Sequence, residues 1–245
     1  MLSWMRQLGE GLVDLVFPPV CVVCRAPSPC FLCDDCTAAM PRLQPPLCSR
    51  CGQGMEMMAV SSDETFAGRV TCRRCRDAAP AFAACRAFGL YDGPLRQAIA
   101  ALKYERLYTV APALAAILAR VLAEEPVLRP ARILVPVPLH PRRERWRGFN
   151  QSVLLARSLA ERTGLELRCD LLVKVRDAKP QVGLSAAQRR ENLREAFRVA
   201  ATDLPRAPLL LVDDVTTTGS TFHECARTLR EAGAASVYAI ALAHD

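Results

Sequence analysis

The chain has 245 residues, 51% of them hydrophobic and 23% charged, a composition typical of a soluble globular protein with room for one or two domains. No apolar run approaches the roughly 18 residues that a membrane span needs, which excludes an integral membrane protein and predicts no membrane insertion. The net charge of +7 is concentrated in residues 85–208, where 22 Lys and Arg stand against 12 Asp and Glu, so we expect a polyanionic ligand there.

The N-terminal segment, residues 1–17, is apolar enough to suggest a signal peptide. Arg6, Glu10 and Asp14 interrupt it, however, and no small-residue cleavage site follows. We therefore expect an amphipathic helix over 1–17 that packs on the body of a cytoplasmic protein.

The next segment, residues 18–80, is rich in cysteine and proline, and its cysteines form four C-x-x-C pairs. One such turn presents two sulfurs to one metal ion, and two turns complete a tetrahedral site with no open position. Redox dithiols and disulfides are the alternatives, and Cys30 competes with Cys33 as a ligand, although only Cys33 keeps the C-x-x-C spacing to Cys36. Consecutive pairing predicts a double zinc ribbon with two structural Zn²⁺ sites, formed by Cys21, Cys24, Cys33 and Cys36 and by Cys48, Cys51, Cys72 and Cys75.

An α/β pattern begins after the cysteine pairs. Apolar runs predict strands over 85–91 and 133–137, and helical spacing predicts helices over 95–103, 111–125 and 151–163, the last capped by Asn150. Between the second strand and Asn150 lies a segment that we expect to be a proline-stiffened turn followed by an arginine-rich loop. Because guanidinium groups hold phosphate oxygens in a bidentate manner, we expect this segment to bind a diphosphate, although a solvated basic loop is the alternative. Its candidate anion-binding residues are Val137, Pro138, His140, Arg142, Arg143, Arg145 and Arg147.

A second basic segment spans 174–198 and is expected to become helical from about Ser185. It contributes further anion-binding candidates, with a solvated surface hairpin as the alternative. These candidates are Lys174, Arg176, Arg189 and Arg190.

The most informative stretch is residues 209–221, LLLVDDVTTTGST. Four apolar residues predict a buried parallel strand, and Asp213 and Asp214 follow it at the carboxyl end, where open α/β sheets bind ligands. The hydroxyl-rich turn then leads into a helix whose N-terminus offers unpaired N–H groups to a phosphate. An ordinary capped helix is the alternative, but a cap does not require two adjacent acids. The predicted phosphate-binding residues are Thr216, Thr217, Thr218, Gly219, Ser220 and Thr221.

This stretch resembles the phosphoribosyl diphosphate (PRPP) motif of type I phosphoribosyltransferases. With LVFPP, the C-x-x-C pairs, YDGPLRQAIAALKY, LVPVPLHPRRERWRGFNQ and PQVGLSAAQRRENLREAF, the whole chain resembles the ComF family of competence-associated proteins. Thr216 departs from that family, which usually has a larger apolar residue there.

The resemblance implies a type I phosphoribosyltransferase-like domain over 81–245, with a Rossmann-like parallel sheet flanked by helices. It also implies a cytoplasmic role in handling single-stranded DNA after uptake, with a DNA-uptake helicase-type partner.

Three functions follow from these patterns. The first is a phosphoribosyltransferase that binds PRPP with Mg²⁺ and uses Asp213 and Asp214 as catalytic residues. The second is a regulatory module that binds PRPP or a nucleotide phosphate without turnover. The third is a protein that binds single-stranded DNA through its arginines and zinc ribbons, and it is compatible with the second.

Overall fold

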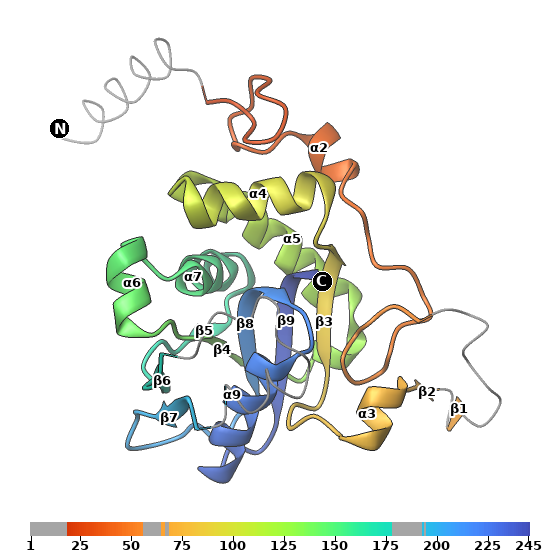
Figure 1. The fold of residues 1–245 in the computed structure, drawn as a ribbon, viewed down its shortest axis with the longest axis vertical. Helices are drawn as coiled ribbons and strands as arrows, with labels where there is room; N and C mark the ends of the chain where they lie inside the picture. Colours follow the sequence, from red (N-terminus) through yellow and green to blue (C-terminus); the bar gives the residue numbers. More distant parts are fainter. Residues whose placement is uncertain (1–18, 56–64, 67–68, 178–192, 194) are drawn as a thin grey trace.

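The computed structural model describes residues 19–55, 65–66, 69–177, 193 and 195–245 (Figure 1). The helix expected over 1–17, the helix expected from Ser185, and the candidates Arg189 and Arg190 lie outside the described residues. Within the described part of the chain, no helix is long and apolar enough to cross a membrane.

The centre of the molecule is a five-stranded sheet in which every pair of neighbours is parallel. From edge to edge its strands are β3 (Cys85–Leu90), β9 (Val237–His244), β8 (Leu209–Thr216), β4 (Ile133–Pro136) and β5 (Glu166–Leu167). The strands expected near 85–91, 133–137 and 209–212 are therefore confirmed. Strand β8 is longer than predicted, because its pairing with β9 continues as far as Thr216 and His244.

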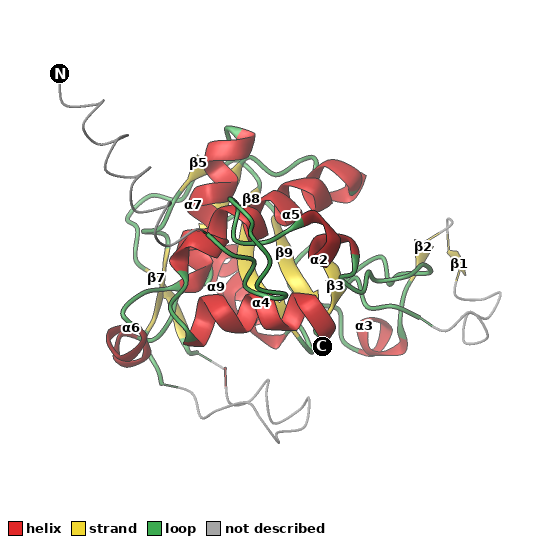
Figure 2. Ribbon diagram, turned by 90° about the horizontal axis from the view of Figure 1, so that it is seen from above, coloured by secondary structure: helices red, strands yellow, loops and turns green. Residues whose placement is uncertain are grey.

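Side chains alternate between the two faces of the sheet and build a core on each face. Leu134 and Leu210 face one core, which helices α4 (Gly93–Tyr104), α5 (Ala111–Glu124) and α7 (Gln151–Thr163) cover. Figure 2 shows these three helices together over the strands. Ile133 and Leu211 face the other core, which is covered by α9 (Ser220–Glu231). Helices on both faces of a parallel sheet agree with the predicted fold class.

The segment after β4 is a helix and not the loop that the sequence predicts. Helix α6 (Pro141–Arg147) begins with Pro141 at its first turn, and the His140 side chain accepts a hydrogen bond from the backbone N–H of Arg142. It ends at Gly148, whose φ of 86° is the left-handed conformation of a helix C-terminus. Helix α7 then starts after Asn150, which caps it through the N–H of Ser152 as expected.

The cysteine-rich segment packs along the edge of the sheet that β3 forms. Residue 41 accepts a hydrogen bond from the N–H of Leu90, and Arg42 pairs with Gly89 in an antiparallel bridge, which covers the open edge of β3. A Cβ at Gly89 would lie 2.1 Å from the carbonyl oxygen of Pro41, so only glycine permits this approach. The short elements of the segment are α2 (Asp34–Ala38), β1 (Thr65–Phe66), β2 (Arg69–Val70) and α3 (Arg73–Asp77).

A small antiparallel pair of strands flanks the core that α9 covers. Its strands, β6 (Leu172–Lys174) and β7 (Phe197–Val199), bracket the basic segment that begins at Lys174. Leu172 and Phe197 join the α9 core and so hold that segment beside the carboxyl end of the sheet. Two 3-10 turns, Tyr108–Val110 and Pro126–Leu128, complete the described elements.

Candidate functional site

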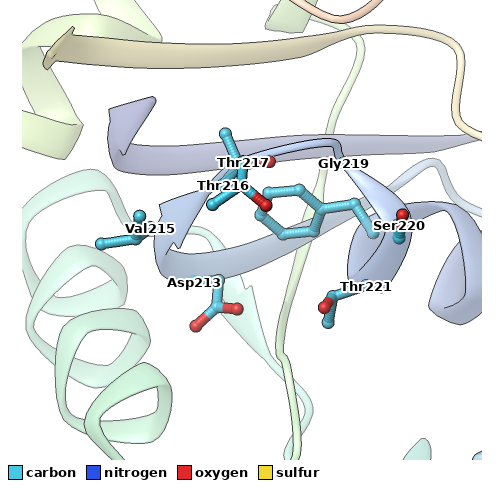
Figure 3. A pocket seen from close by; sticks show the side chains of 8 residues that line it. Asp213, Val215, Thr216, Thr217, Gly219, Ser220 and Thr221 are labelled. Atoms are coloured by element: carbon cyan, nitrogen blue, oxygen red, sulfur yellow. The ribbon is translucent and has the colours of Figure 1, made fainter. Parts of the chain in front are cut away.

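A pocket of about 160 Å³ lies at the carboxyl end of β8, where the chain turns into α9 (Figure 3). Asp213 lies on one wall, and the hydroxyl-rich turn with the start of α9 forms the rest. Figure 3 shows the Asp213 carboxylate and the Thr221 hydroxyl on the same side of this turn. The lining residues are Asp213, Val215, Thr216, Thr217, Gly219, Ser220, Thr221 and Phe222.

The turn is shaped to leave donors at the helix N-terminus. Gly219 has φ 72°, a left-handed conformation that glycine adopts without strain, and α9 starts at the next residue. The N-cap residue Gly219 has no side chain to cap α9, and among the described side chains the Thr218 hydroxyl accepts from the N–H of Ser220 at 3.4 Å. The hydroxyl groups of Thr218 and Ser220 lie 2.6 Å apart and bond to each other. This is the arrangement of backbone and hydroxyl donors that binds a phosphate group.

The two acids occupy different environments. Asp213 lines the pocket, where the hydroxyl of Ser152 and the N–H of Asp214 donate to its Oδ1 at 2.7 and 2.9 Å. Asp214 is 3% exposed and forms an ion pair with Lys103 of α4, while the Gln151 amide donates to its Oδ1 at 3.4 Å. The sequence alone does not distinguish the two aspartates, whereas in the structure Asp213 lines the pocket and Asp214 is buried behind it.

The two environments shift the pKa values of the two acids in opposite directions. Burial, and then the negative charge of Asp214, raises the pKa of Asp213 to about 7. Burial also opposes the ionisation of Asp214 and Lys103, but their mutual attraction outweighs it, so the pKa of Asp214 is lowered and that of Lys103 is raised. Asp214 is thus an ionised, paired group, and Asp213 is an acid that changes charge near neutral pH.

The structure brings part of the predicted basic cluster to this site. Burial, and then the charge of Arg143, lowers the pKa of Lys174, while the charge of Asp213 opposes this decrease, so these three groups lie within electrostatic reach of one another. Arg143 also forms a 3.4 Å ion pair with Asp177. Lys174 itself lies over the Phe197 ring, 5.2 Å from its centroid.

The remaining basic candidates are distributed over α6 and its surroundings. Arg147 donates to the Gln151 side chain at 2.6 Å, and Gln151 in turn contacts Asp214, which connects α6 to the acid pair. Val137 is buried and its carbonyl accepts from Asn150, so it contributes backbone structure. Pro138 and His140 lead into α6, and Arg142, Arg145 and Arg176 are exposed residues that do not line the pocket.

The eight predicted cysteine ligands form two separate clusters, with the sulfur atoms of each cluster within 4.8 Å of one another. The first contains Cys21, Cys24, Cys33 and Cys36, and the second contains Cys48, Cys51, Cys72 and Cys75. Backbone N–H groups donate to three of the sulfurs, from Cys33 to Cys21 and from Cys36 to Cys33 at 3.4 Å and from Cys72 to Cys48 at 3.3 Å. Four thiolates at this separation require a cation between them, and an all-sulfur tetrahedral set fits structural Zn²⁺.

Three residues of the site were missed by the sequence interpretation, namely Lys103, Gln151 and Ser152. Lys103 is a single basic residue in an otherwise apolar turn of α4. This isolated charge was the only local indication that Lys103 has a buried acidic partner. Gln151 and Ser152 are the first residues after the Asn150 cap, so they lie at a helix start beside the end of β4. Their roles depend on packing between distant segments.

Comparison with known proteins places the chain among relatives of the same length and organisation. Residues 12–76 match the family described as the double zinc ribbon domain. The DNA utilization protein YhgH of Salmonella typhimurium is 35% identical over 236 residues, which cover 91% of this chain and 96% of that protein. Competence protein F of Haemophilus influenzae is 30% identical over 217 residues, which cover 86% and 90%. The chain belongs to the ComF family.

The family assignment and the structure together confirm the predicted fold class. This ComF protein combines a parallel sheet, flanked by helices on both faces, with an N-terminal double zinc ribbon whose cysteines cluster as predicted. A solved glutamine PRPP amidotransferase from B. subtilis, complexed with ADP and GMP, is 26% identical over 54% of this chain and 26% of that one, with a TM-score of 0.36.

Proposed function

We propose that this ComF protein binds PRPP or a nucleotide phosphate in the pocket at the end of β8. The main support for this proposal is that Asp213 and the turn into α9 line the same pocket. The 5′-phosphate would accept hydrogen bonds from the turn and the first N–H groups of α9, while Asp213 would accept from ribose hydroxyls. The hydroxyls that line the pocket and the acid thus match the two ends of a ribose 5-phosphate.

The diphosphate of PRPP would lie towards Lys174 and Arg143. Both are cationic, and Lys174 is close enough to Asp213 for their charges to interact. Mg²⁺ would enter with the diphosphate, since carboxylate and phosphate oxygens are the hard ligands that it prefers. Arg147 would act through Gln151 on Asp214 and so keep the acid pair in position.

Calorimetry tests this proposal with a matched pair of variants on α9. Thr221→Val removes a hydroxyl from the pocket, whereas Thr228→Val removes one that bonds to the carbonyl of Glu224 farther along the same helix. Thr221→Val should weaken the binding of Mg²⁺-PRPP to the zinc-loaded protein by about tenfold, because the hydroxyl would donate to a charged phosphate. Thr228→Val should bind as the unmodified protein does. Equal affinity of all three proteins, or no binding by any of them, would refute the proposed site.

We further propose that the ligand site serves the handling of imported single-stranded DNA in the cytoplasm, with a DNA-uptake helicase-type protein as partner. The names of the relatives, a competence protein and a DNA utilization protein, support this role. An exposed surface beside the site supports it too: the side chains of Trp146, Tyr104 and Tyr108 are 71%, 64% and 45% exposed. Arg147 lies over the Tyr104 ring at 5.8 Å, and Arg106 donates to the carbonyl of Trp146.

This aromatic and basic surface fits a single strand, whose bases stack on rings while its phosphates meet guanidinium groups. Gel shifts with single-stranded and double-stranded DNA across a salt series test the proposal. We expect binding to the single strand that weakens steeply as salt increases. Absence of binding at about 50 mM salt would contradict it.

The second candidate function is an active phosphoribosyltransferase. The position of Asp213 on the pocket favours this function, because its carboxylate, when ionised, can offset positive charge that develops on the ribose ring. Lys174 and Arg143 would then stabilise the departing diphosphate. Release of diphosphate from PRPP in the presence of a nucleobase or an amine would establish turnover, whereas PRPP binding without release would leave a binding module.

A further inference from the structure

A second cavity, of about 180 Å³, lies between the cysteine-rich segment and the turn that leads into α9. Cys51, Arg74, Cys75, Ala78, Pro80 and Phe82 line one side. Thr218, Gly219, Ser220 and His223 line the other. The cavity is therefore built from two segments that lie far apart in the sequence.

Arg74 is the charged residue of this cavity. It lies on α3 between Cys72 and Cys75, two ligands of the second cysteine cluster. One terminal nitrogen of its guanidinium group, Nη2, is buried and has no hydrogen-bond partner among the described residues. A buried donor of a charged group is unfavourable without a partner, which points to an anionic partner for this nitrogen.

The other polar atoms of the cavity are suited to the same partner. The Thr218 and Ser220 hydroxyls and the N-terminus of α9 are donors, and no Asp or Glu is among the described residues that line the cavity. His223 accepts a hydrogen bond at Nδ1 from the N–H of Ala81, which fixes the proton of a neutral ring on Nε2. Cys51 and Cys75 lie on the zinc-ribbon side, and the donors of the turn and of Arg74 are the groups that would bind an oxyanion.

The electrostatic effect of Arg74 on His244 agrees with a position of Arg74 near the carboxyl end of the sheet. Burial, and then the charge of Arg74, lowers the pKa of His244. His244 pairs in register with Thr216, the last residue of β8. The second zinc ribbon therefore brings a positive charge to the back of the phosphate turn.

We propose that Arg74, Thr218 and Ser220 form a binding site for a phosphate group at the junction of the second zinc ribbon and the turn into α9. The site takes one tetrahedral dianion, either free phosphate or a phosphate group of a nucleotide ligand. It goes beyond the proposed PRPP pocket, because it adds a residue of the zinc ribbon to the ligand-binding surface. Zinc occupancy of the second cluster then affects anion affinity through the position of α3.

The test compares Arg74→Gln with Arg73→Gln in the zinc-loaded full chain. Arg73 lies on the same helix, but its side chain is 89% exposed and pairs with Asp77. Calorimetric titration with inorganic phosphate should give about a ten- to hundredfold loss of affinity for Arg74→Gln and little change for Arg73→Gln. Elemental analysis should give equal zinc content for all three proteins.

A second pair of variants keeps the test decisive if Arg74→Gln fails to fold. Ala78 is exposed at the wall of the cavity, so Ala78→Glu supplies a competing carboxylate without touching the core, and Ala78→Gln is its neutral control. Phosphate binding should be lost in Ala78→Glu and kept in Ala78→Gln.

A parallel titration with PRPP identifies the source of the phosphate. If Arg74→Gln weakens both ligands, the site holds a phosphate group of PRPP, and if it weakens inorganic phosphate alone, the site is separate. The inference is overturned if the unmodified protein does not bind phosphate. It is also overturned if Arg74→Gln lowers only zinc retention and leaves phosphate affinity unchanged, since Arg74 would then only balance the thiolate charge. PRPP binding by the unmodified protein, with unchanged affinity for both PRPP and inorganic phosphate in Arg74→Gln, would leave the proposed function intact and remove this one.

Discussion

Replacing Asp213 with asparagine should stabilise the protein without ligand and abolish its binding of PRPP. Asparagine keeps an oxygen to accept from Ser152 and from the N–H of residue 214, so the local structure is preserved. Burial raises the pKa of Asp213 from 3.8 to about 7. A pKa change of one pH unit corresponds to about 1.4 kcal/mol, so at pH 8 this increase lowers the free energy of unfolding by at most about 4 kcal/mol. Because solvent reaches part of the side chain and screens its charge, we expect a gain of about 2 kcal/mol.

The gain should depend on pH in a defined direction. Between about pH 4 and pH 7 the folded chain keeps the proton of Asp213 and the unfolded chain does not, so stability falls as pH rises and is constant above that range. The difference between Asp213→Asn and the unmodified protein should therefore be about 1 kcal/mol larger at pH 8 than at pH 6. Urea denaturation of the zinc-loaded proteins measures it, with the exposed Asp203 replaced by asparagine as control. A variant less stable than the unmodified protein at both pH values would refute the reasoning.

Three further predictions concern other parts of the molecule. The protein should carry about two zinc ions, and chelation should unfold the cysteine-rich segment, as circular dichroism and elemental analysis would report; protein purified without chelator that contains no zinc would contradict this. Lys103→Met should destabilise the fold by about 3 kcal/mol in urea denaturation, because it leaves Asp214 as a buried charge without its partner, and a change below about 1 kcal/mol would show that the pair contributes little. Trp146→Ala and Tyr104→Ala should each weaken single-stranded DNA binding by about 1 to 3 kcal/mol in gel shifts without changing PRPP affinity; unchanged DNA affinity in both would exclude this surface.

The local features of the site could be predicted from the sequence because they depend on neighbouring residues. The apolar run before Asp213 and the hydroxyl-rich turn after it lie within one short stretch, and the structure brings Asp213 and the turn together on one pocket. The different environments of Asp213 and Asp214 could not be predicted. They depend on Lys103 and Ser152, which come from helices much earlier in the chain and meet β8 only through packing.

Helix α6 was not predicted from the sequence, for a different reason. Its capping signals, Pro141 at the first turn and Gly148 at the end, are present in the sequence, but the arginines between them favoured an exposed loop. The cysteine spacing, by contrast, predicted both clusters correctly, because C-x-x-C fixes the distance between sulfurs within a single turn. The position of the second cluster beside the turn of β8 follows from the tertiary fold, and no local pattern encodes it.

The most direct test of the central claim is a crystal structure of the zinc-loaded protein with Mg²⁺ and PRPP. The account predicts the 5′-phosphate within hydrogen-bonding distance of the backbone N–H groups between Thr217 and Thr221, with a ribose hydroxyl on Asp213. Ligand bound elsewhere, or a pocket without ligand at a saturating PRPP concentration, would contradict it.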